Sequence, residues 1–234
     1  MSEYVFKVYG LTEENFKNRV EQLSQGISID YKIVADGLDI KFMFTPLGPI
    51  SNEIDLFVKN FLSAFDENIY ALRDVSLKEQ LVDILKLNGY KISVAESFTG
   101  GNVAATIISV AGASSVFYEG IVAYNEKAKV ERLGVNLQSL QKFKPVSSVV
   151  AEEMAVGLIK GGNCDISIST TGLAGPDGDG SGMPVGLCYI GLACFGEVHT
   201  YKFMFSGNRN DVIEQGVGFA LLKAIKCLTL QINR

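Results

Sequence analysis

The stretch SVAESFTGGNVAA, residues 93–105, joins two apolar runs through a serine, a glutamate, a threonine and two glycines. The first run has the length and composition of a buried strand, and the second continues at helical spacing. An apolar strand followed by a glycine-containing loop and a helix is the repeating unit of α/β folds. The stretch therefore predicts a strand-to-helix turn, and it raises the question whether Ser97 at this turn is a nucleophile.

The same alternation repeats toward the C-terminus. A further strand and helix are predicted at 115–124 and 125–135, and a helix followed by a strand at 151–162 and 165–176. After a glycine-rich loop, two apolar runs flank Gly196-Glu197 and indicate an antiparallel hairpin, and a long helix over about 211–230 closes the chain. We therefore expect a layered α/β/α domain with a mixed sheet.

The first 75 residues have a different pattern, with shorter strands and two amphipathic helices. Their order is strand, helix, strand, strand, helix, strand, which predicts a small βαββαβ domain of the split-βαβ type; the segments are 4–10, 12–23, 29–35, 39–44, 51–65 and 68–71. Ser76 and Glu79 then form a capping-box pattern for a helix that ends at Gly89. We place the boundary near Asp74, giving an α/β protein with domains 1–75 and 76–234.

Composition and charge narrow the class of protein. The chain has 234 residues, of which 47% are hydrophobic, so it can bury a substantial core. Residues 1–75 carry seven basic and twelve acidic side chains, which leaves 14 of each for the rest of the chain. Neither part has the basic surface that nucleic-acid binding requires. No apolar run reaches the roughly 18 residues of a membrane span, and Met1 is not followed by a basic, apolar leader, so we expect a soluble, cytoplasmic protein without membrane contact. A homo-oligomer is compatible with this sequence.

Cysteine and histidine exclude several kinds of site. The four cysteines form no CxxC pair and are interpreted as buried thiols; they are Cys164, Cys188, Cys194 and Cys227. His199 is the only histidine and lies within a predicted strand, so a Ser-His-Asp hydrolase or a histidine metal site is not favoured. Asp177 and Asp179 share a glycine-rich loop without a third acidic partner, which indicates a solvated turn. We expect no metal site and no cofactor.

Three loops follow predicted strands, where open α/β sheets usually bind ligands: 96–101, 124–129 and 170–176. A serine nucleophile without histidine needs another base, and lysine or tyrosine can serve. Tyr124 and Lys129 lie in the loop that offers both, about one helical turn apart. A core tyrosine and a solvated lysine are the structural alternative, which the local pattern leaves open.

Several motifs together resemble one known family. The segments AESFTGG, GIVAYNEKAKVERLGV, PVSSVVAEEMAVG, TTGLAGPDGDGSGMPVG and FSGNRNDV have the order and spacing of the CinA C-terminal domain, the nicotinamide mononucleotide (NMN) amidohydrolase family. The resemblance covers about residues 76–234. The preceding residues resemble the KH-like linking domain of CinA proteins. The molybdopterin-binding-like domain that opens those proteins is not in this sequence, so its metal-dependent ADP-ribose pyrophosphatase activity is not expected here.

The resemblance implies an activity and a set of site residues. By similarity, Ser97, Tyr124 and Lys129 are the catalytic serine, tyrosine and lysine, and Arg209 binds the substrate phosphate. The glycine-rich loops that line the family's pocket correspond to Thr99, Gly100, Gly101, Thr171, Gly172 and Gly175. The implied reaction is hydrolysis of the NMN carboxamide to nicotinic acid mononucleotide and ammonia. The implied partner is a small pyridine nucleotide, and backbone N–H groups of residues 98–101 are candidates for the oxyanion hole.

The sequence also departs from the family pattern. Phe98 stands where the family usually has cysteine, and Met183 where it usually has lysine. In the segment YNEKAK, asparagine occupies position 125 and Lys127 replaces a glutamate. These changes keep open the alternative of a catalytically degenerate CinA-like protein that acts through partners in competence or the DNA-damage response. An RNA-binding version is not favoured, because residues 1–75 are acidic and contain no GxxG loop.

Overall fold

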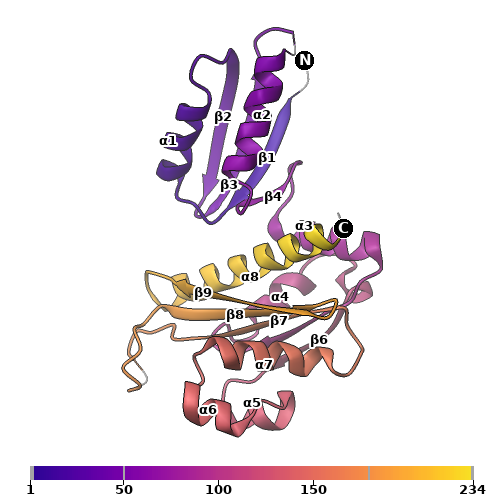
Figure 1. Cartoon of the computed structure of the whole chain (residues 1–234), viewed down its shortest axis with the longest axis vertical. Coiled ribbons are helices and arrows are strands. Elements are labelled where there is room, and N and C mark those ends of the chain that lie inside the picture. Colours follow the sequence, from indigo (N-terminus) through magenta and orange to yellow (C-terminus); the bar gives the residue numbers. More distant parts are fainter. Residues whose placement is uncertain (1–2, 50, 179, 233–234) are drawn as a thin grey trace. The chain divides into compact units, whose positions relative to one another are not determined.

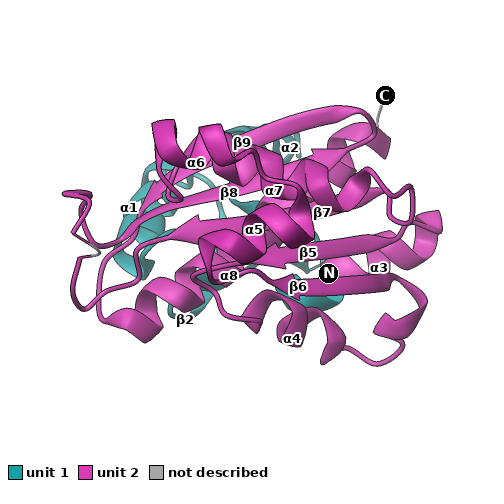
Figure 2. Ribbon diagram, turned by 90° about the horizontal axis from the view of Figure 1, so that it is seen from below, with its two compact units in different colours: residues 1–80 teal, residues 81–234 magenta. Residues whose placement is uncertain are grey.

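The computed structural model describes residues 3–49, 51–178 and 180–232. The chain divides into two compact units, residues 1–80 and 81–234, which are coloured separately in Figure 2. The division falls inside helix α3 (Leu77–Asn88), a few residues beyond the boundary expected from the sequence. Helix α3 begins with the predicted capping box, because the Ser76 N–H donates to the Glu79 carboxylate at 2.9 Å and the Glu79 N–H donates to the Ser76 hydroxyl at 3.4 Å.

The first unit is the predicted βαββαβ domain. Its elements are β1 (Tyr4–Tyr9), α1 (Glu13–Leu23), β2 (Ile29–Asp36), β3 (Asp39–Pro46), α2 (Asn52–Ala64) and β4 (Ile69–Ala71). The antiparallel sheet has the order β2-β3-β1-β4. Alternate side chains of β3 are buried, and both helices contribute to the same core, so both cover one face of this sheet. Phenylalanine rings fill that core; for example, the ring centroids of Phe42 and Phe61 lie 4.8 Å apart.

The second unit is a three-layer α/β/α domain around a mixed sheet, as predicted. Its elements after α3 are β5 (Ile92–Glu96), α4 (Asn102–Ile108), the 3₁₀ turn η1 (Ala113–Ser115), β6 (Phe117–Val122), α5 (Glu126–Leu133), α6 (Leu137–Phe143), α7 (Ser148–Ile159), β7 (Ile166–Gly172), β8 (Leu187–Cys194), β9 (Glu197–Met204) and α8 (Arg209–Ile232). The sheet order is β6-β5-β7-β8-β9. Strands β6, β5 and β7 are parallel, β8 pairs with β7 in the antiparallel direction, and β9 pairs antiparallel with β8. Figure 1 shows α4 and α8 on one face of this sheet and α7, with α5 and α6 beyond it, on the other.

The order of the parallel strands places a site at their carboxyl ends. From β5, the middle one of the three parallel strands, the chain passes to β6 on one side, and then crosses to β7 on the other. Such a reversal opens a crevice at the carboxyl ends of the strands. Ser97 follows β5 directly, Tyr124 comes two residues after β6, and Thr171 lies at the end of β7. The fold therefore gathers three of the predicted site residues at one edge of the sheet.

Two details of the second unit differ from the prediction. Cys194 pairs with Glu197 across the hairpin, so the turn residues are Phe195 and Gly196, and not Gly196-Glu197. Both have positive φ, 51° and 84°, which suits the twist of a two-residue hairpin. In addition, α6 is a separate short helix that the sequence pattern did not predict.

The cysteine prediction was correct for two of the four residues. Cys164 and Cys188 are free and buried. Cys194 of β8 and Cys227 of α8 form a disulfide across a sequence separation of 33 residues, which corrects the expectation of four thiols. Their spacing in the sequence does not reveal the pairing, because the strand and the helix meet only in the folded domain.

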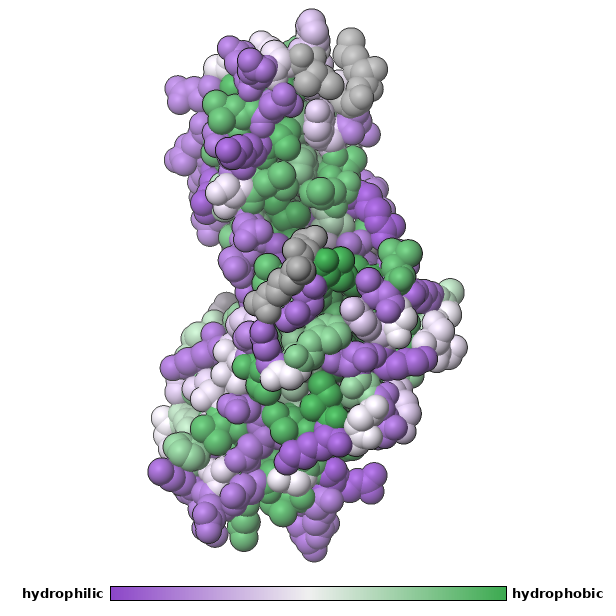
Figure 3. All heavy atoms as spheres, turned by 45° about the vertical axis from the view of Figure 1, so that its right-hand side comes forward, coloured by the Kyte–Doolittle hydropathy of each residue, from purple (hydrophilic) through white to green (hydrophobic). Residues whose placement is uncertain are grey.

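The described helices include none that is long and apolar enough to cross a bilayer. In Figure 3, hydrophilic side chains are spread among hydrophobic ones over the visible face of each unit. His199 lies in β9, as predicted, and its ring is 3.3 Å from the Glu197 carboxylate two residues away. Histidine thus takes no part in the site at the carboxyl ends of the parallel strands.

Candidate active site

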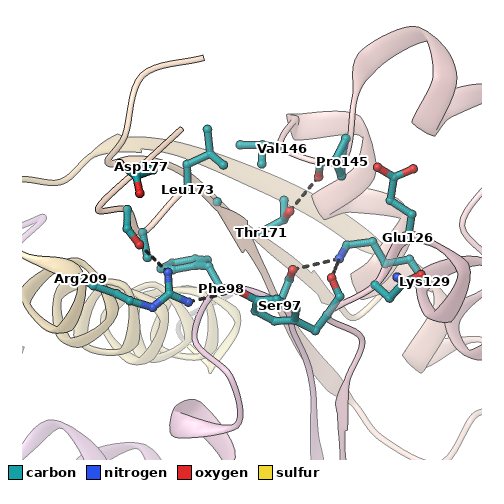
Figure 4. A pocket seen from close by; sticks show the side chains of 15 residues that line it. Ser97, Phe98, Glu126, Lys129, Pro145, Val146, Thr171, Leu173, Asp177 and Arg209 are labelled. Carbon is teal, nitrogen blue, oxygen red and sulfur yellow. Dashed lines mark hydrogen bonds between the residues drawn. The ribbon is translucent and has the colours of Figure 1, made fainter. Parts of the chain in front are cut away.

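A pocket of about 450 Å³ opens at the carboxyl ends of β5, β6 and β7 (Figure 4). It is lined by the loops that follow these strands, by α5, by the loop between α6 and α7, and by the first residue of α8. The lining residues are Ser97, Phe98, Tyr124, Asn125, Glu126, Lys129, Pro145, Val146, Thr171, Gly172, Leu173, Ala174, Gly175, Asp177 and Arg209. This volume lies within the range of roughly 300–1,000 Å³ that is typical of sites for small ligands. All three predicted catalytic residues therefore border one pocket.

Ser97 and Lys129 are in direct contact. The Lys129 ammonium donates to Ser97 Oγ at 2.9 Å and to the Ala123 carbonyl at 2.7 Å, as Figure 4 shows for the first contact. Helix α5 makes this geometry, because the Asn125 side chain caps its N-terminus by accepting the Lys127 N–H at 2.8 Å. Lys129 lies one turn into the helix and is only 1% exposed. Lys129 is therefore not the solvated lysine of the structural alternative, because its amine is buried beside the serine.

Burial changes the proton affinity of this amine. Desolvation lowers the pKa of Lys129 to about 8, and the nearby Glu126 carboxylate opposes part of that shift. An amine with a pKa near 8 is neutral in about one molecule in ten at pH 7. In that neutral form its nitrogen can accept the proton of the Ser97 hydroxyl, so the pair has the elements of a nucleophile and its general base.

The turn that carries Ser97 is held from the neighbouring strand β7. The Ser97 N–H donates to the Thr170 carbonyl at 2.9 Å, and the Thr99 and Thr170 hydroxyls are 2.6 Å apart. Thr99 is fully buried, so it supports the turn and does not line the pocket. Ser97 is 8% exposed, which leaves its hydroxyl at the floor of the pocket.

The backbone of the same turn narrows the choice of oxyanion donors. The Gly100 N–H donates to the Ser97 carbonyl, and the Gly101 N–H donates to a glutamate carboxylate. Within the described parts of the chain, the N–H groups of Phe98 and Thr99 donate no hydrogen bond. Of the four predicted donors, these two have no hydrogen-bond acceptor, but only Phe98 lines the pocket, so its N–H group is the candidate to bind an oxyanion next to Ser97. Gly100 and Gly101 do not line the pocket and instead give the turn its positive φ angles of 61° and 98°.

Arg209 and Tyr124 meet on the opposite side of the pocket from Lys129. Arg209 Nη1 donates to the Gly175 carbonyl at 2.6 Å, and its Nη2 donates to the Tyr124 hydroxyl at 3.1 Å. The Tyr124 side chain is 61% exposed, and within the described residues its hydroxyl makes no hydrogen bond with Ser97 or Lys129. The structure thus brings Ser97 to Lys129 and Tyr124 to Arg209, as two pairs in one pocket.

The loop after β7 supplies the remaining predicted residues. Thr171 lines the pocket and donates through its hydroxyl to the Pro145 carbonyl at 2.7 Å. A Cβ at Gly172 would lie 2.5 Å from the Cys188 sulfur, so glycine is required for the close approach of β7 and β8. Gly175 offers the carbonyl that holds Arg209.

Sequence reasoning did not place two acidic groups, Glu126 and Asp177, at the pocket that they line, because Asp177 was interpreted only as part of a solvated turn. Both lie in loop or helix-start positions whose pattern is that of solvated surface residues. Asp179, the second member of the predicted acidic pair, lies outside the described residues. The structure's described residues contain no group of three histidine, cysteine, aspartate or glutamate side chains that could hold a metal ion.

Comparison with known proteins gives a consistent result. Residues 74–228 match the family model for the CinA C-terminal domain. A CinA-like protein of Kosmotoga olearia is 45% identical over 163 residues, covering 70% of this chain and 40% of that protein. A relative in Clostridium kluyveri, named as a competence-damage inducible protein, is 36% identical over 227 residues, covering 92% of this chain and 54% of its own length. The chain therefore spans about half the length of the curated relatives it matches.

Solved structures agree with the sequence comparison. A CinA superfamily protein from Klebsiella pneumoniae has a TM-score of 0.64 at 30% identity, covering 66% of this chain and 96% of that one. The corresponding superfamily protein from Escherichia coli has a TM-score of 0.61 at 32% identity, covering 67% and 88% of the two chains. The family match, residues 74–228, includes every residue that lines the pocket.

Proposed function

The chain belongs to the CinA family, and on that premise we propose that it hydrolyses the carboxamide of NMN to nicotinic acid mononucleotide and ammonia. The observation that carries the proposal is the contact of 2.9 Å between the buried Lys129 amine and Ser97 Oγ. A serine paired with a lysine of lowered pKa is an arrangement suited to acyl transfer.

In the proposed reaction, neutral Lys129 takes the hydroxyl proton while Ser97 Oγ attacks the amide carbonyl. The N–H group of Phe98 stabilises the negative charge on the carbonyl oxygen, where one such donor is typically worth about 10²- to 10³-fold in rate. The carbon–nitrogen bond then breaks, and Lys129 returns the proton to the leaving amine, which departs as ammonia. Water, deprotonated by the same lysine, hydrolyses the acyl-enzyme and regenerates Ser97.

Arg209 is the proposed partner of the substrate phosphate, because a guanidinium binds phosphate in two-point fashion better than an ammonium does. The direct contact between Lys129 and Ser97 needs no relay through Tyr124. We assign Tyr124 to orienting Arg209, through the hydrogen bond between its hydroxyl and the guanidinium. The proposed partner is thus a small pyridine nucleotide, with no cofactor, nucleic acid or membrane involved.

The test is ammonia release from purified protein incubated separately with NMN, nicotinamide riboside and NAD. NMN hydrolysis should disappear in Ser97→Ala, while the free energy of unfolding changes by no more than about 1 kcal/mol, because one hydroxyl is removed from a turn. Ser114→Ala, on the exposed η1 turn, is the matched control and should retain activity. If wild-type protein releases no ammonia from any of the three substrates, the degenerate, partner-dependent alternative replaces this proposal.

A further inference from the structure

Glu96 is a buried carboxylate that the reaction above does not use. It is the last residue of β5, directly before Ser97, and its side chain is 1% exposed. It does not line the pocket. A carboxylate this deeply buried is costly unless several hydrogen bonds compensate for the lost water.

Three backbone N–H groups at the start of α4 supply those hydrogen bonds. Glu96 Oε2 accepts from Gly101 at 2.9 Å and from Val103 at 3.0 Å, while Oε1 accepts from Ala104 at 2.8 Å. The N-cap residue Gly101 has no side chain that could do this. The carboxylate therefore occupies the N-terminus of α4, so the positive end of this helix is not available to a substrate phosphate.

These contacts also close the serine turn. The segment from residue 97 to residue 100 leaves β5 at Glu96 and returns to the Glu96 carboxylate at Gly101. The free N–H group of Phe98, which lines the pocket, lies within this closed segment. Its direction relative to Ser97 is thus fixed on one side by Glu96, and on the other by the bond from the Ser97 N–H to Thr170.

The backbone of Glu96 extends the same control to the base. Its carbonyl accepts the Ala123 N–H at 2.8 Å, and the Ala123 carbonyl in turn accepts from the Lys129 amine at 2.7 Å. One residue thus contacts both the turn that presents the nucleophile and the loop that anchors the lysine. The side chain makes the first of these contacts and the backbone carbonyl the second, so a substitution at position 96 changes the first alone.

We propose that Glu96 is a positioning residue, whose carboxylate holds the Phe98 N–H group in place as the oxyanion donor beside Ser97. The inference deepens the proposed function, since it rests on Ser97 acting as a nucleophile, but it does not depend on NMN being the substrate. It makes Glu96 necessary for reaction at Ser97 although Glu96 touches neither the substrate nor the reacting atoms.

The test uses an aryl fluorophosphonate, which labels activated serines whatever their natural substrate. Ser97 Oγ forms a bond to phosphorus, fluoride leaves with the phosphorus–fluorine bond electrons, and the hydroxyl proton passes to Lys129. Labelling is quantified on the full-length protein by intact mass, and peptide mapping confirms that Ser97 carries the adduct. In Glu96→Gln, an amide NH₂ replaces one acceptor oxygen and faces a backbone donor, so the labelling rate should fall by about tenfold or more.

Glu153→Gln is the matched control. Glu153 also accepts a backbone N–H, from Asn136 at 2.9 Å, and a hydroxyl, from Ser139 at 2.6 Å, but it caps α6 and does not line the pocket. Its variant should label at the wild-type rate. Glu96→Asp keeps the charge but retracts it by one methylene group; it should also label slowly, and it serves as the second variant if the glutamine variant fails to fold by near-ultraviolet circular dichroism.

A second readout separates positioning from stability. If NMN is hydrolysed, Glu96→Gln should lower kcat by about tenfold or more with KM changed less than about twofold, and the acidic limb of the pH profile should stay at the wild-type pH, because the base is untouched. Labelling at the wild-type rate in Glu96→Gln, or an equal loss in Glu153→Gln, would overturn the inference. A wild-type protein that is labelled at Ser97 but does not hydrolyse NMN would refute the proposed substrate alone, and a wild-type Ser97 that is not labelled would refute both.

Discussion

Lys129 determines the pH range in which the proposed chemistry can run. Its burial lowers the amine pKa to about 8, so the neutral base accumulates as pH rises toward and past that value. We predict that kcat/KM for NMN rises with an acidic limb near pH 8, well below the ordinary lysine pKa of about 10.4. Lys129→Arg keeps the charge but stays protonated, and should be nearly as inactive as Lys129→Ala. Substantial turnover by the arginine variant would make Lys129 an electrostatic anchor instead of the base.

Glu126 tunes the same residue. Its carboxylate favours the protonated amine and raises the pKa of Lys129 against the effect of burial. In Glu126→Gln the Lys129 pKa should fall below about 8, and the acidic limb of kcat/KM should move to lower pH. Glu131→Gln, which removes a carboxylate paired with Lys127 on the exposed side of α5, is the control and should leave the limb in place. A limb that does not move in Glu126→Gln would mean that another group sets it.

Lys129 should also make the free energy of unfolding depend on pH. Because its folded-state pKa lies below the unfolded value, the folded protein carries a penalty below pH 8 that is relieved as pH rises from about 8 to about 10.5. Relative to Lys129→Met, the wild type should therefore gain up to about 3 kcal/mol of unfolding free energy between pH 7 and pH 10.5. Urea denaturation of both proteins at the two pH values measures this gain. A difference between the two proteins that does not change with pH would show that the amine is not desolvated.

The sequence was informative about which residues gather at the site, and less so about how their side chains point. The positions of Ser97 and Lys129 after neighbouring parallel strands follow from the strand-loop-helix pattern, and the structure places them in contact. The direction of the Tyr124 hydroxyl, toward Arg209, depends on a residue 85 positions away that no local pattern relates to it. Glu96 was missed because a glutamate at a strand end has the pattern of a solvated residue, and only the tertiary fold buries it.

At the scale of elements, small residues let α7 approach its neighbours closely. The hydroxyls of Ser167 and Ser169 in β7 donate to the Ala155 and Ala151 carbonyls of α7. A Cβ added at Gly157 of α7 would collide with the Leu133 carbonyl at the end of α5. Since α5 carries Lys129, this packing indirectly supports the site.

Gly157→Ala therefore tests the packing of α7 against α5. In an exposed helix this change would stabilise the protein by up to about 1 kcal/mol, because alanine has the higher helix propensity. Here the clash with backbone should reverse the sign and destabilise the protein by about 1–3 kcal/mol. Gly178→Ala, where a Cβ would meet nothing within 4 Å, is the control and should be nearly neutral. Urea denaturation decides between the two signs, and a stabilised Gly157→Ala protein would contradict the packing described.

Element order was predictable because hydrophobic periodicity and turn residues are local signals. The order βαββαβ and the later strand and helix alternation follow from them, and the structure has both. The exceptions have physical causes. Helix α6 is only seven residues long and shares a polar segment with its loops. The hairpin turn moved by one residue because Phe195 takes the left-handed conformation that the pattern assigns to glycine.

At the scale of the whole molecule, each unit has its own hydrophobic core and its own sheet. The pocket and every proposed catalytic side chain belong to the second unit. The acidic excess lies within the first 75 residues, and residues 76–234 carry equal numbers of acidic and basic side chains. The domain assignment from sequence stays a prediction that limited proteolysis near residues 72–80 can examine.

Chelation provides a further prediction for the whole chain. Because the described residues include no cluster of three metal-binding side chains, NMN hydrolysis should survive exhaustive EDTA treatment and dialysis. Metal content by mass spectrometry before and after dialysis checks that the treatment was complete. Activity lost on chelation and restored by a divalent cation would show that a metal takes part.

Arg209 has a consequence for how ligands are ranked. Its guanidinium already donates hydrogen bonds to the Gly175 carbonyl and the Tyr124 hydroxyl, so an incoming phosphate competes with these two acceptors for the same N–H groups. The affinity for the ligand then reflects the exchange of existing arginine hydrogen bonds for new ones to the phosphate, and the net gain in free energy per hydrogen bond is small. Ligands that leave the Gly175 bond intact and displace only the longer one to Tyr124 should be favoured over those that require both to break. Selectivity at this pocket would arise less from how strongly a ligand attracts the arginine than from how little it disturbs it.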